Sequence, residues 1–351
     1  MKEKRWIYKT ILYLAICLGL FGTVMIVVDP YFHFHKPISG ISYRLYEERY
    51  VNDGIARNFE YDAIITGTSM TQNFKTTEFD LLFDCKSIKL PFSGAGYQEI
   101  SQSLQRAFSY HDSIRYVLWG LDCDLLVREY DYHNYDEYPD YLYDNNPWND
   151  VNYIFNKDLM YHGSLNNIMM TISGESSTSF DSYSAWEMES GYDAVMKYYS
   201  PVNDILPDEG LSQEERRMVE ENVQKNICAV IEQHPDTTFY LFFTPYSIVY
   251  WDKCHREGSV SAEIEAQAIA ANLILQYPNA KIYCFNHNME LITNLNHYKD
   301  TIHFTADISS KILQWIMEGE YELKSNDLIE HERIEKEVYK NYNYQAIFKT
   351  Q

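Results

Sequence analysis

The sequence has few cysteines for its length, and none of them follows a metal-binding pattern. Six occur in 351 residues, without a Cys-x-x-Cys pair or a zinc-type Cys/His spacing. Five follow residue 30, and an odd number cannot all pair within one chain (Cys85, Cys123, Cys228, Cys254 and Cys284). A disulfide framework is therefore not expected, although one or two bridges remain open.

Basic residues are also scarce, with 29 Lys and Arg against 51 Asp and Glu and a net charge of −22. Because residues 1–9 alone are net +3, the remainder of the chain carries −25. Such a charge argues against nucleic acid or an anionic bilayer surface as a partner, and it favours cationic ligands or neutral glycans. No glycine-rich loop that could cradle a phosphate is present, so a nucleotide-binding protein is disfavoured and no cofactor is expected.

One long apolar segment is present, at the N-terminus. Residues 7–28 contain a single charge, Lys9, and at ~1.5 Å per residue they are long enough to cross a hydrocarbon layer of ~30 Å. A cleavable signal peptide shares the basic start, but this segment ends in VVDP, which is not a small-x-small cleavage site. We therefore expect residues 1–6 in the cytoplasm, a single-pass anchor at 7–28 in the cell membrane, and the rest outside the cell.

Beyond a connector at residues 29–60, strand and helix patterns alternate. Apolar runs predict strands, a helical pattern from Met70 to about Phe83 follows the first of them, and Ser212 with Glu215 predicts a capping box at a later helix. The alternation predicts an α/β fold with a doubly wound parallel sheet, flavodoxin-like and three-layered, whose ligands bind beyond the carboxyl ends of the strands. The expected strands are 63–66, 87–91, 116–121, 238–243 and 280–285.

Two segments interrupt or follow this pattern. Residues 125–210 form a tyrosine-rich insert, which is either a sugar-binding surface over the active-site edge or, as we favour, a long surface excursion. The acidic tail at 321–351 predicts a solvated helix that carries Glu330, Glu332 and Glu335. The histidines that could suggest a metal lack suitable partners in sequence, so no metal site is predicted (His33, His35, His287 and His297).

A nucleophile, a base and a carboxylate stand at the two ends of the alternating region. Gly67-Thr68-Ser69-Met70 follows the first strand, and Asp300-Thr301-Ile302-His303 precedes the last helix of the region. A serine hydroxyl needs a base within hydrogen-bond reach, and the base needs a carboxylate to fix its tautomer. We therefore predict Ser69 as nucleophile, His303 as general base and Asp300 as its orienting residue.

Four short blocks resemble those of the SGNH (GDSL-like) hydrolase superfamily over roughly residues 61–320. In order they are Gly67-Thr68-Ser69-Met70, Ser93-Gly94-Ala95, Gly120-Leu121-Asp122 and Asp300-Thr301-Ile302-His303. With a single N-terminal anchor before the serine block, the chain resembles the surface-exposed branch of the superfamily. That branch includes the D-alanyl transfer protein DltD and the O-acetyl transfer proteins of bacterial polysaccharides. The resemblance implies a catalytic domain at 61–320, with the backbone N–H groups of Ser69 and Gly94 facing the oxyanion.

Two departures and one further residue complete the predicted site. Thr68 replaces the usual aspartate of the first block, a change that the surface-anchored members tolerate. Asp122 stands where the family typically has an oxyanion-donating asparagine, and an ionised carboxylate cannot donate. Either Asp122 is protonated, or another donor replaces it, or the site is weakened. Tyr246 follows the fourth strand and is a candidate substrate contact, although Pro245 beside it could simply end the strand.

The leading function is a membrane-inserted extracellular serine esterase or O-acyltransferase. It would form an acyl-Ser69 intermediate and pass the group to water or to a cell-wall or exported glycan, and a membrane acyltransferase is a candidate partner. The alternative is a catalytically inactive protein of the same fold that binds glycan or scaffolds an envelope assembly system.

Overall fold

The computed structural model describes residues 2–135 and 138–348, which belong to two compact units. One unit comprises Met1–Glu60 and Tyr135–Ser179, and the other comprises Tyr61–Asn134 and Phe180–Gln351. The chain therefore passes between the units three times. The tyrosine-rich insert is divided by this arrangement: its middle part belongs with the anchor and connector, and both of its ends belong to the unit that holds the sheet.

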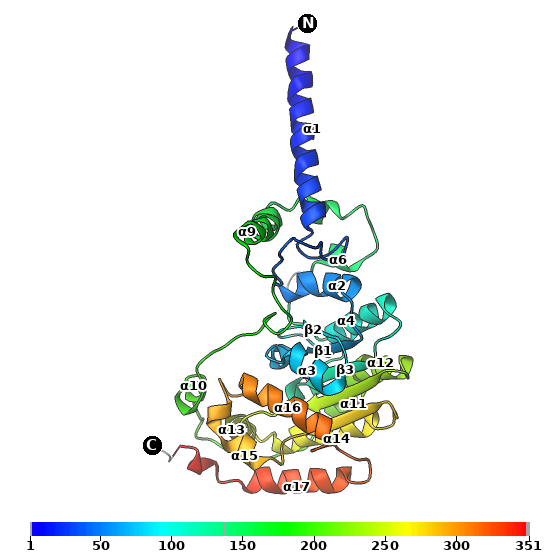
Figure 1. The fold of residues 1–351 in the computed structure, drawn as a ribbon. Helices are drawn as coiled ribbons and strands as arrows, with labels where there is room; N and C mark the ends of the chain where they lie inside the picture. Colours follow the sequence, from blue (N-terminus) through cyan, green and yellow to red (C-terminus); the bar gives the residue numbers. More distant parts are fainter. Residues whose placement is uncertain (1, 136–137, 349–351) are drawn as a thin grey trace. The chain divides into compact units, whose positions relative to one another are not determined.

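The first unit begins with one long helix, α1 (Lys2–Val28), drawn in blue in Figure 1. Its segment from Lys4 to Val28 has a mean hydropathy of 2.6 and is long and apolar enough to span a membrane. Most of it is exposed, whereas Met25 and Val28 near its end are buried in the unit. The other helices of this unit are α2 (Glu48–Asn58), α6 (Asp140–Tyr143), α7 (Val151–Ile154), α8 (Lys157–Leu159), the π-helical η2 (Met160–Leu165) and α9 (Asn166–Ser173).

A buried carboxylate organises the chain just after α1. Asp29 accepts the backbone N–H groups of residues 33, 34 and 35 at 2.9, 2.8 and 3.0 Å, and the Tyr153 hydroxyl at 2.7 Å. Burial raises the pKa of Asp29 although these bonds oppose it. His33 Nε2 lies 3.0 Å from Asp150 Oδ1, and the His35 ring contacts the Ile26 and Lys36 carbonyls, so both histidines take part in local structure.

The second unit is built on a five-stranded parallel sheet in the order β2-β1-β3-β4-β5. This order is that of doubly wound, flavodoxin-like sheets, and it reverses direction at the boundary between β1 and β3. The fold is therefore mixed α/β with a fully parallel sheet, and the predicted strands are confirmed to within a residue at their ends. Their bounds are β1 (Ala63–Gly67), β2 (Ser87–Pro91), β3 (Tyr116–Leu121), β4 (Thr238–Phe243) and β5 (Ala280–Cys284).

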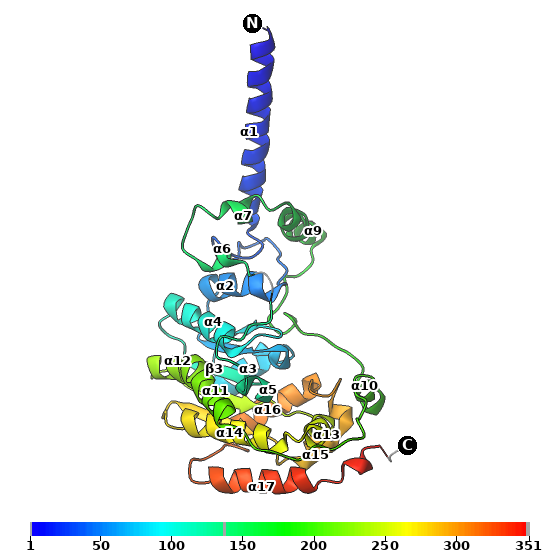
Figure 2. The ribbon, with the colours of Figure 1, turned by 180° about the vertical axis from the view of Figure 1, so that it is seen from behind.

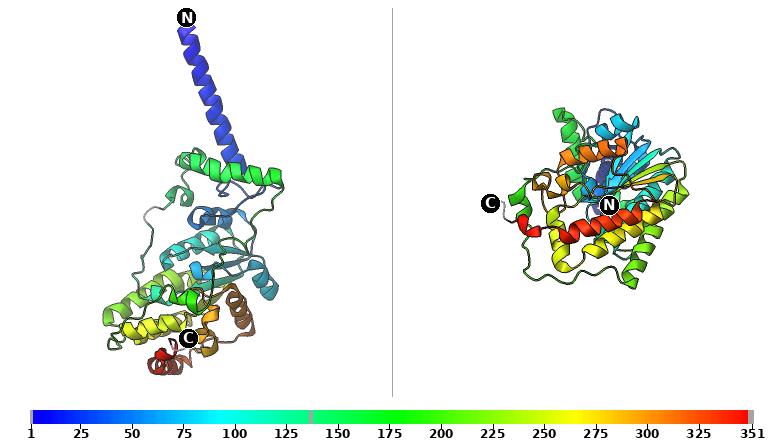
Figure 3. Two further views of the ribbon diagram at one scale, coloured as in Figure 1. Left: turned by 90° about the vertical axis from the view of Figure 1, so that its left-hand side faces the viewer. Right: turned by 90° about the horizontal axis from the view of Figure 1, so that it is seen from below.

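Helices cover both faces of the sheet. In the right-hand view of Figure 3, α16 (Ala306–Glu318) lies on one side of the strands, while α14 (Val260–Ile274) and α17 (Leu328–Asn341) lie on the other. Figure 2 shows α11 (Gln213–Val223), α14 and α17 in that order on the second side. Also present are α3 (Thr76–Phe83), α4 (Tyr97–Tyr110), α5 (Cys123–Leu126), α10 (Tyr192–Met196), η3 (Gln224–Cys228), α12 (Ala229–Gln233), α13 (Ile248–Glu257), α15 (Met289–Thr293), η4 (Leu295–His297) and η5 (Tyr344–Ala346).

Some of the local structure predicted from the sequence is present and some is not. The capping box of Ser212 and Glu215 is present in both directions at the start of α11. The helix expected from Met70 to Phe83 is instead a short 3-10 turn, η1 (Ser69–Thr71), followed by α3. The tail forms the predicted helix α17. Glu335 on this helix is only 2% exposed, so the prediction that the helix is solvated is wrong at this residue. All six cysteines are free thiols.

Candidate active site

Ser69 is the first residue of a tight turn where β1 leaves the sheet. Gly67 before it has φ of +146°, and a Cβ there would lie 2.6 Å from Thr71 Cγ2 and 3.1 Å from the Gly120 carbonyl. Only glycine fits this backbone and this space. The Thr68 side chain then accepts the Met70 N–H, which starts η1. The turn leaves Ser69 half-buried at the carboxyl edge of the sheet.

The structure brings together the three predicted catalytic residues. Ser69 Oγ lies 2.8 Å from His303 Nε2, and His303 Nδ1 lies 2.7 Å from Asp300 Oδ2. The other carboxylate oxygen, Asp300 Oδ1, accepts the backbone N–H groups of Ile302 and His303 at 2.9 and 2.8 Å. Burial alone would raise the pKa of Asp300, but the bonds from His303 and Ile302 outweigh it and hold that pKa below its usual range. Asp300 is therefore an anion that can fix the imidazole tautomer.

The loop that carries the histidine is tied to the loop after β4. The Ser247 hydroxyl donates to the Thr301 carbonyl at 2.7 Å, and the Ser247 N–H reaches the same oxygen at 3.3 Å. The Lys299 N–H donates to the His303 carbonyl at 2.8 Å. These bonds fix the position of the His303 imidazole relative to the end of β4.

Trp186 touches His303 and was not anticipated from the sequence. Its ring meets the His303 ring edge to face, with centroids 5.1 Å apart at 80°. The Lys299 ammonium donates to the Trp186 carbonyl at 2.8 Å and lies 4.0 Å from the ring centroid, while Asn73 accepts the Trp186 N–H at 2.9 Å. Burial lowers the pKa of Lys299. No motif marks Trp186, because it lies in the insert, and only the fold places it here.

The loop after β2 runs alongside the turn that carries Ser69. Gly67 pairs with Pro91 in the sheet, and the Phe92 N–H donates to the Gly67 carbonyl at 2.9 Å, so Ser69 and Gly94 follow paired residues at the same edge. Gly94 has φ of +67°, and a Cβ built there would lie 3.3 Å from Asn134 Nδ2. Within the described ranges, neither the Gly94 N–H nor the Asn134 side-chain amide has a hydrogen-bond partner.

Asp122 does not take the place expected for it. Its carboxyl is buried and contacts the Thr68 hydroxyl through Oδ2, and the Thr244 and Tyr246 hydroxyls through Oδ1 at 2.9 and 3.2 Å. Burial, with the charge of Asp124, raises the pKa of Asp122 to about 6 despite these bonds. Because both oxygens face neighbouring hydroxyls, the side chain holds the strand ends together and is not an exposed oxyanion donor.

Tyr246 belongs to the same buried group. It is 2% exposed, its hydroxyl lies 3.0 Å from Asp124 Oδ1, and its ring packs edge to face on Tyr250 with centroids 4.5 Å apart. The prediction of a substrate contact at Tyr246 is therefore wrong. The polar tip that suggested such a contact binds the carboxylates beneath the site.

The raised pKa of Asp122 predicts a pH-dependent effect of Asp122→Asn. In the folded state this pKa is about 6, against 3.8 in the unfolded chain, so the stability gained from the protonated carboxyl is complete below pH 3.8 and lost as the pH rises through about 6. An amide keeps one donor and one acceptor and does not ionise. The stability of the variant relative to the wild type should therefore increase by ~3 kcal/mol from acid to neutral pH.

Chemical denaturation at several pH values measures this difference. Asp131→Asn, at an exposed carboxylate outside the site, is the matched control and should parallel the wild type. Parallel curves for Asp122→Asn and the wild type would contradict the prediction.

Comparisons with known proteins add a distant similarity of fold. No family model and no curated protein matches the chain. A solved structure from Streptococcus pneumonia, described provisionally as a platelet activating factor, aligns with 77% of this chain and 91% of its own, at 11% identity and a TM-score of 0.39. At this TM-score the similarity carries no argument about function.

Proposed function

We propose that this chain is a membrane-anchored serine esterase or O-acyltransferase that acts outside the cell on acyl or acetyl groups of a cell-wall or exported glycan. The observation that carries the proposal is the chain of hydrogen bonds from Ser69 Oγ through the His303 imidazole to Asp300. Its distances are those of a nucleophile, a base and an orienting carboxylate. The four sequence blocks that resemble SGNH hydrolases, distributed over the ends of β1, β2 and β3 and the segment before α16, also support it.

In the first half-reaction, Ser69 Oγ attacks the ester carbonyl while its proton moves to His303 Nε2. Asp300 accepts the Nδ1–H throughout and stabilises the imidazolium. The carbon–oxygen bond to the leaving alcohol then breaks, and the alcohol takes the proton from Nε2. In the second half-reaction, water or a glycan hydroxyl gives its proton to Nε2 and attacks the acyl carbon. The bond from that carbon to Ser69 Oγ then breaks, and Oγ takes the proton back from Nε2. Water gives an esterase, and a glycan hydroxyl gives a transferase.

The negative oxygen that develops on the carbonyl needs donors held in place beforehand. The Ser69 and Gly94 backbone N–H groups fill two of these positions by family resemblance. Asp122 cannot supply the third donor, and Asn134 takes this role. The Asn134 amide lies beside Gly94 and makes no hydrogen bond within the described part of the chain. The sequence places Asn134 outside the third block, so its role follows only from the contact between the two loops.

Asn134→Ala should lower kcat by ~10²–10³ with little change in KM, since the lost bond is made mainly to the transition state. The side chain is exposed, so the fold should be unaffected. Hydrolysis of a chromogenic acetyl ester measures both constants, and Asn203→Ala, at another exposed asparagine of the same unit, is the control. An unchanged kcat in Asn134→Ala would remove this residue from the mechanism.

The anchor and the charge suggest where the reaction takes place and on what. The basic residues before α1 favour a cytoplasmic N-terminus, which leaves the rest of the chain outside. A polymer assembled at the membrane surface would then stay within reach of the site, and a membrane acyltransferase could supply the acyl donor. A neutral glycan suits the acidic outer part of the chain better than an anionic polymer does.

Labelling of the full-length protein in detergent with a serine-reactive fluorophosphonate tests the proposal. We expect covalent modification at Ser69, identified by peptide mass spectrometry. Absence of labelling in the folded protein would favour the alternative, a catalytically inactive protein that binds glycan or scaffolds an envelope assembly system on this fold.

A further inference from the structure

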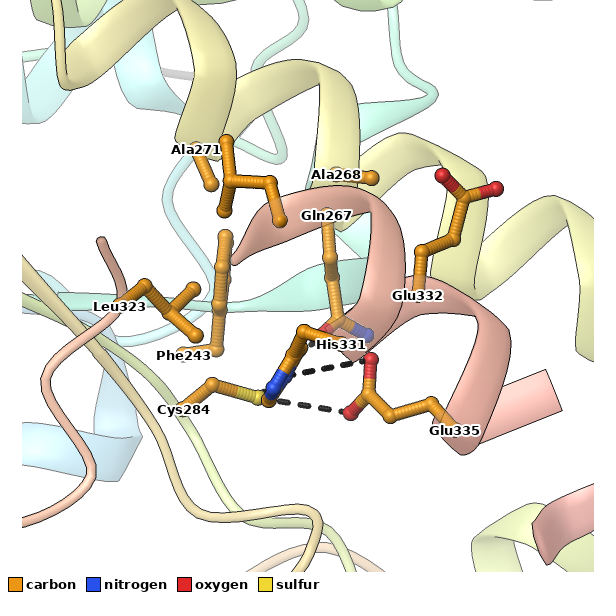
Figure 4. Close-up of a pocket in the computed structure, with 10 residues that line it drawn as sticks. Phe243, Gln267, Ala268, Ala271, Cys284, Leu323, His331, Glu332 and Glu335 are labelled. Carbon is orange, nitrogen blue, oxygen red and sulfur yellow. Dashed lines mark hydrogen bonds and ion pairs between the residues drawn. The ribbon is translucent and has the colours of Figure 1, made fainter. Parts of the chain in front are cut away.

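A second cluster of reactive side chains lies between the end of β5 and helix α17. Cys284, the last residue of β5, faces His331 and Glu335 on α17, and one ligand atom from each of the three lies within 4.8 Å of the other two. Figure 4 shows the three side chains pointing toward one another. Cys284 and Glu335 are buried at 2% exposure each, and His331 is partly buried.

The three side chains satisfy one another only in part, since the Cys284 thiol hydrogen-bonds to Glu335 but His331 makes no hydrogen bond through Nε2 within the described residues. Cys284 Sγ lies 3.5 Å from Glu335 Oε1, and His331 Nε2 lies 3.5 Å from Glu335 Oε2. His331 Nε2 is buried and has no hydrogen-bond partner in the described part of the chain. A buried imidazole nitrogen without a hydrogen bond is costly unless a further group binds it.

We propose that Cys284 Sγ, His331 Nε2 and the Glu335 carboxylate bind a divalent transition-metal ion, and the chemistry of the donors favours Zn²⁺. Thiolate, imidazole and carboxylate together are zinc ligands, whereas Mg²⁺ and Ca²⁺ take oxygen donors. In a tetrahedral site, bond lengths of ~2.0–2.3 Å place the donor atoms about 3.3–3.8 Å from one another. The donor atoms, now within 4.8 Å of one another, therefore need to close by about 1.5 Å at most.

Space and surroundings also suit an ion. The three residues line a cavity of about 10 Å³ together with apolar side chains of Phe243 and Leu323, which is room for one occupant the size of a water molecule. Gln267 Oε1 lies 3.9 Å from Cys284 Sγ and is available as a fourth ligand, or a water fills that position. The cation would offset the charges of the ionised thiolate and carboxylate.

Neighbouring side chains hold the His331 ring and the Gln267 amide in place. The His287 ring packs on the His331 ring with centroids 4.0 Å apart and a tilt of 33°, and the Asn286 amide donates to Gln267 Oε1 at 3.0 Å. Such contacts orient ligands around a metal. An ion at this position would fasten α17 to the edge strand of the sheet. The sequence did not indicate the site because Cys284 lies 47 residues before His331 and 51 residues before Glu335, which is not a metal-binding spacing.

Cobalt titration of the metal-free full-length protein in detergent tests this proposal. Co²⁺ bound by a thiolate gives a charge-transfer absorption in the near ultraviolet, and Zn²⁺ in excess should displace it. We expect about one equivalent of Co²⁺ per chain. Cys284→Ser should abolish the thiolate band, and His331→Gln should weaken binding at least ~100-fold.

Two variants serve as matched controls. Cys254→Ser replaces another buried cysteine of the same unit, and His297→Gln replaces another partly buried histidine; both should retain the band and the affinity. His331→Gln changes a side chain that is 17% exposed, so it should fold even if Cys284→Ser does not. A wild-type protein without a cobalt band, or equal affinities in the wild type and His331→Gln, would overturn the proposal and leave a thiol–carboxylate hydrogen bond in its place. The readout is independent of the activity of Ser69.

Discussion

Ser69→Ala should abolish fluorophosphonate labelling and lower the hydrolysis of a chromogenic acetyl ester by up to ~10⁶ in kcat, the magnitude seen when a serine nucleophile is removed from a complete triad. In the proposed mechanism Ser69 Oγ forms the bond to the acyl group, and His303 Nε2, which lies 2.8 Å away, accepts its proton. Removal of Oγ leaves the turn intact, because Gly67 and Thr68 shape the backbone there.

His303→Ala should cost about as much, and the double variant should lose little more, because the two residues act as one unit. Additive losses would indicate that they do not cooperate. Ser113→Ala is the matched control, since Ser113 is exposed in the segment that enters β3, at the opposite edge of the sheet from Ser69. Loss of activity in Ser113→Ala would point to general destabilisation instead of chemistry.

Asp300→Asn should lower kcat by ~10⁴ while the protein stays folded. The amide oxygen can still accept the backbone N–H groups that Asp300 Oδ1 binds now, so the loop keeps its shape. The amide nitrogen, however, would face His303 Nδ1 as a donor, and it would force the proton onto Nε2, where the base must be free. The negative charge that stabilises the imidazolium is lost as well.

A pH profile and thermal melting together measure this effect. We expect a small decrease in melting temperature, since the ionised carboxylate stabilises the fold, and a slow residual rate that rises with pH, as hydroxide substitutes for the missing base. Asp236→Asn, at an exposed carboxylate before β4, should match the wild type in both measurements. A kcat within a few-fold of wild type in Asp300→Asn would contradict the proposed role of this carboxylate.

The sheet and the triad could be predicted because each depends on local signals. Buried strands are recognisable as short apolar runs. Their alternation with helices implies a parallel sheet, and the Ser69 and Asp300–His303 segments follow strands that end at its carboxyl edge. The position of Trp186 could not be predicted. Its ring contacts His303 from a distant segment of the insert, and no sequence pattern marks such a contact. The same holds for the proximity of Asn134 to Gly94.

Asp122, Tyr246 and Glu335 were misjudged for a shared reason. Each is polar and stands near a strand end or on an acidic helix, where exposure is the usual expectation, yet each is buried against other polar groups. The hydroxyls around Asp122 and the thiol beside Glu335 come from distant segments. Burial of a polar side chain is decided by its partners in space, which sequence patterns do not reveal.

The bond between Ser69 and His303 joins residues 234 positions apart, and β4, β5 and the loop before α16 all lie between them in the chain. A contact of such long range cannot form before His303 has been synthesised, and the entropy of closing the intervening chain must be offset by other contacts. A chain that is still being synthesised and exported would carry the nucleophile for most of that time without its base. If the proposed function is right, activity begins only when the domain is complete, and a truncated or stalled chain would be inert at the membrane.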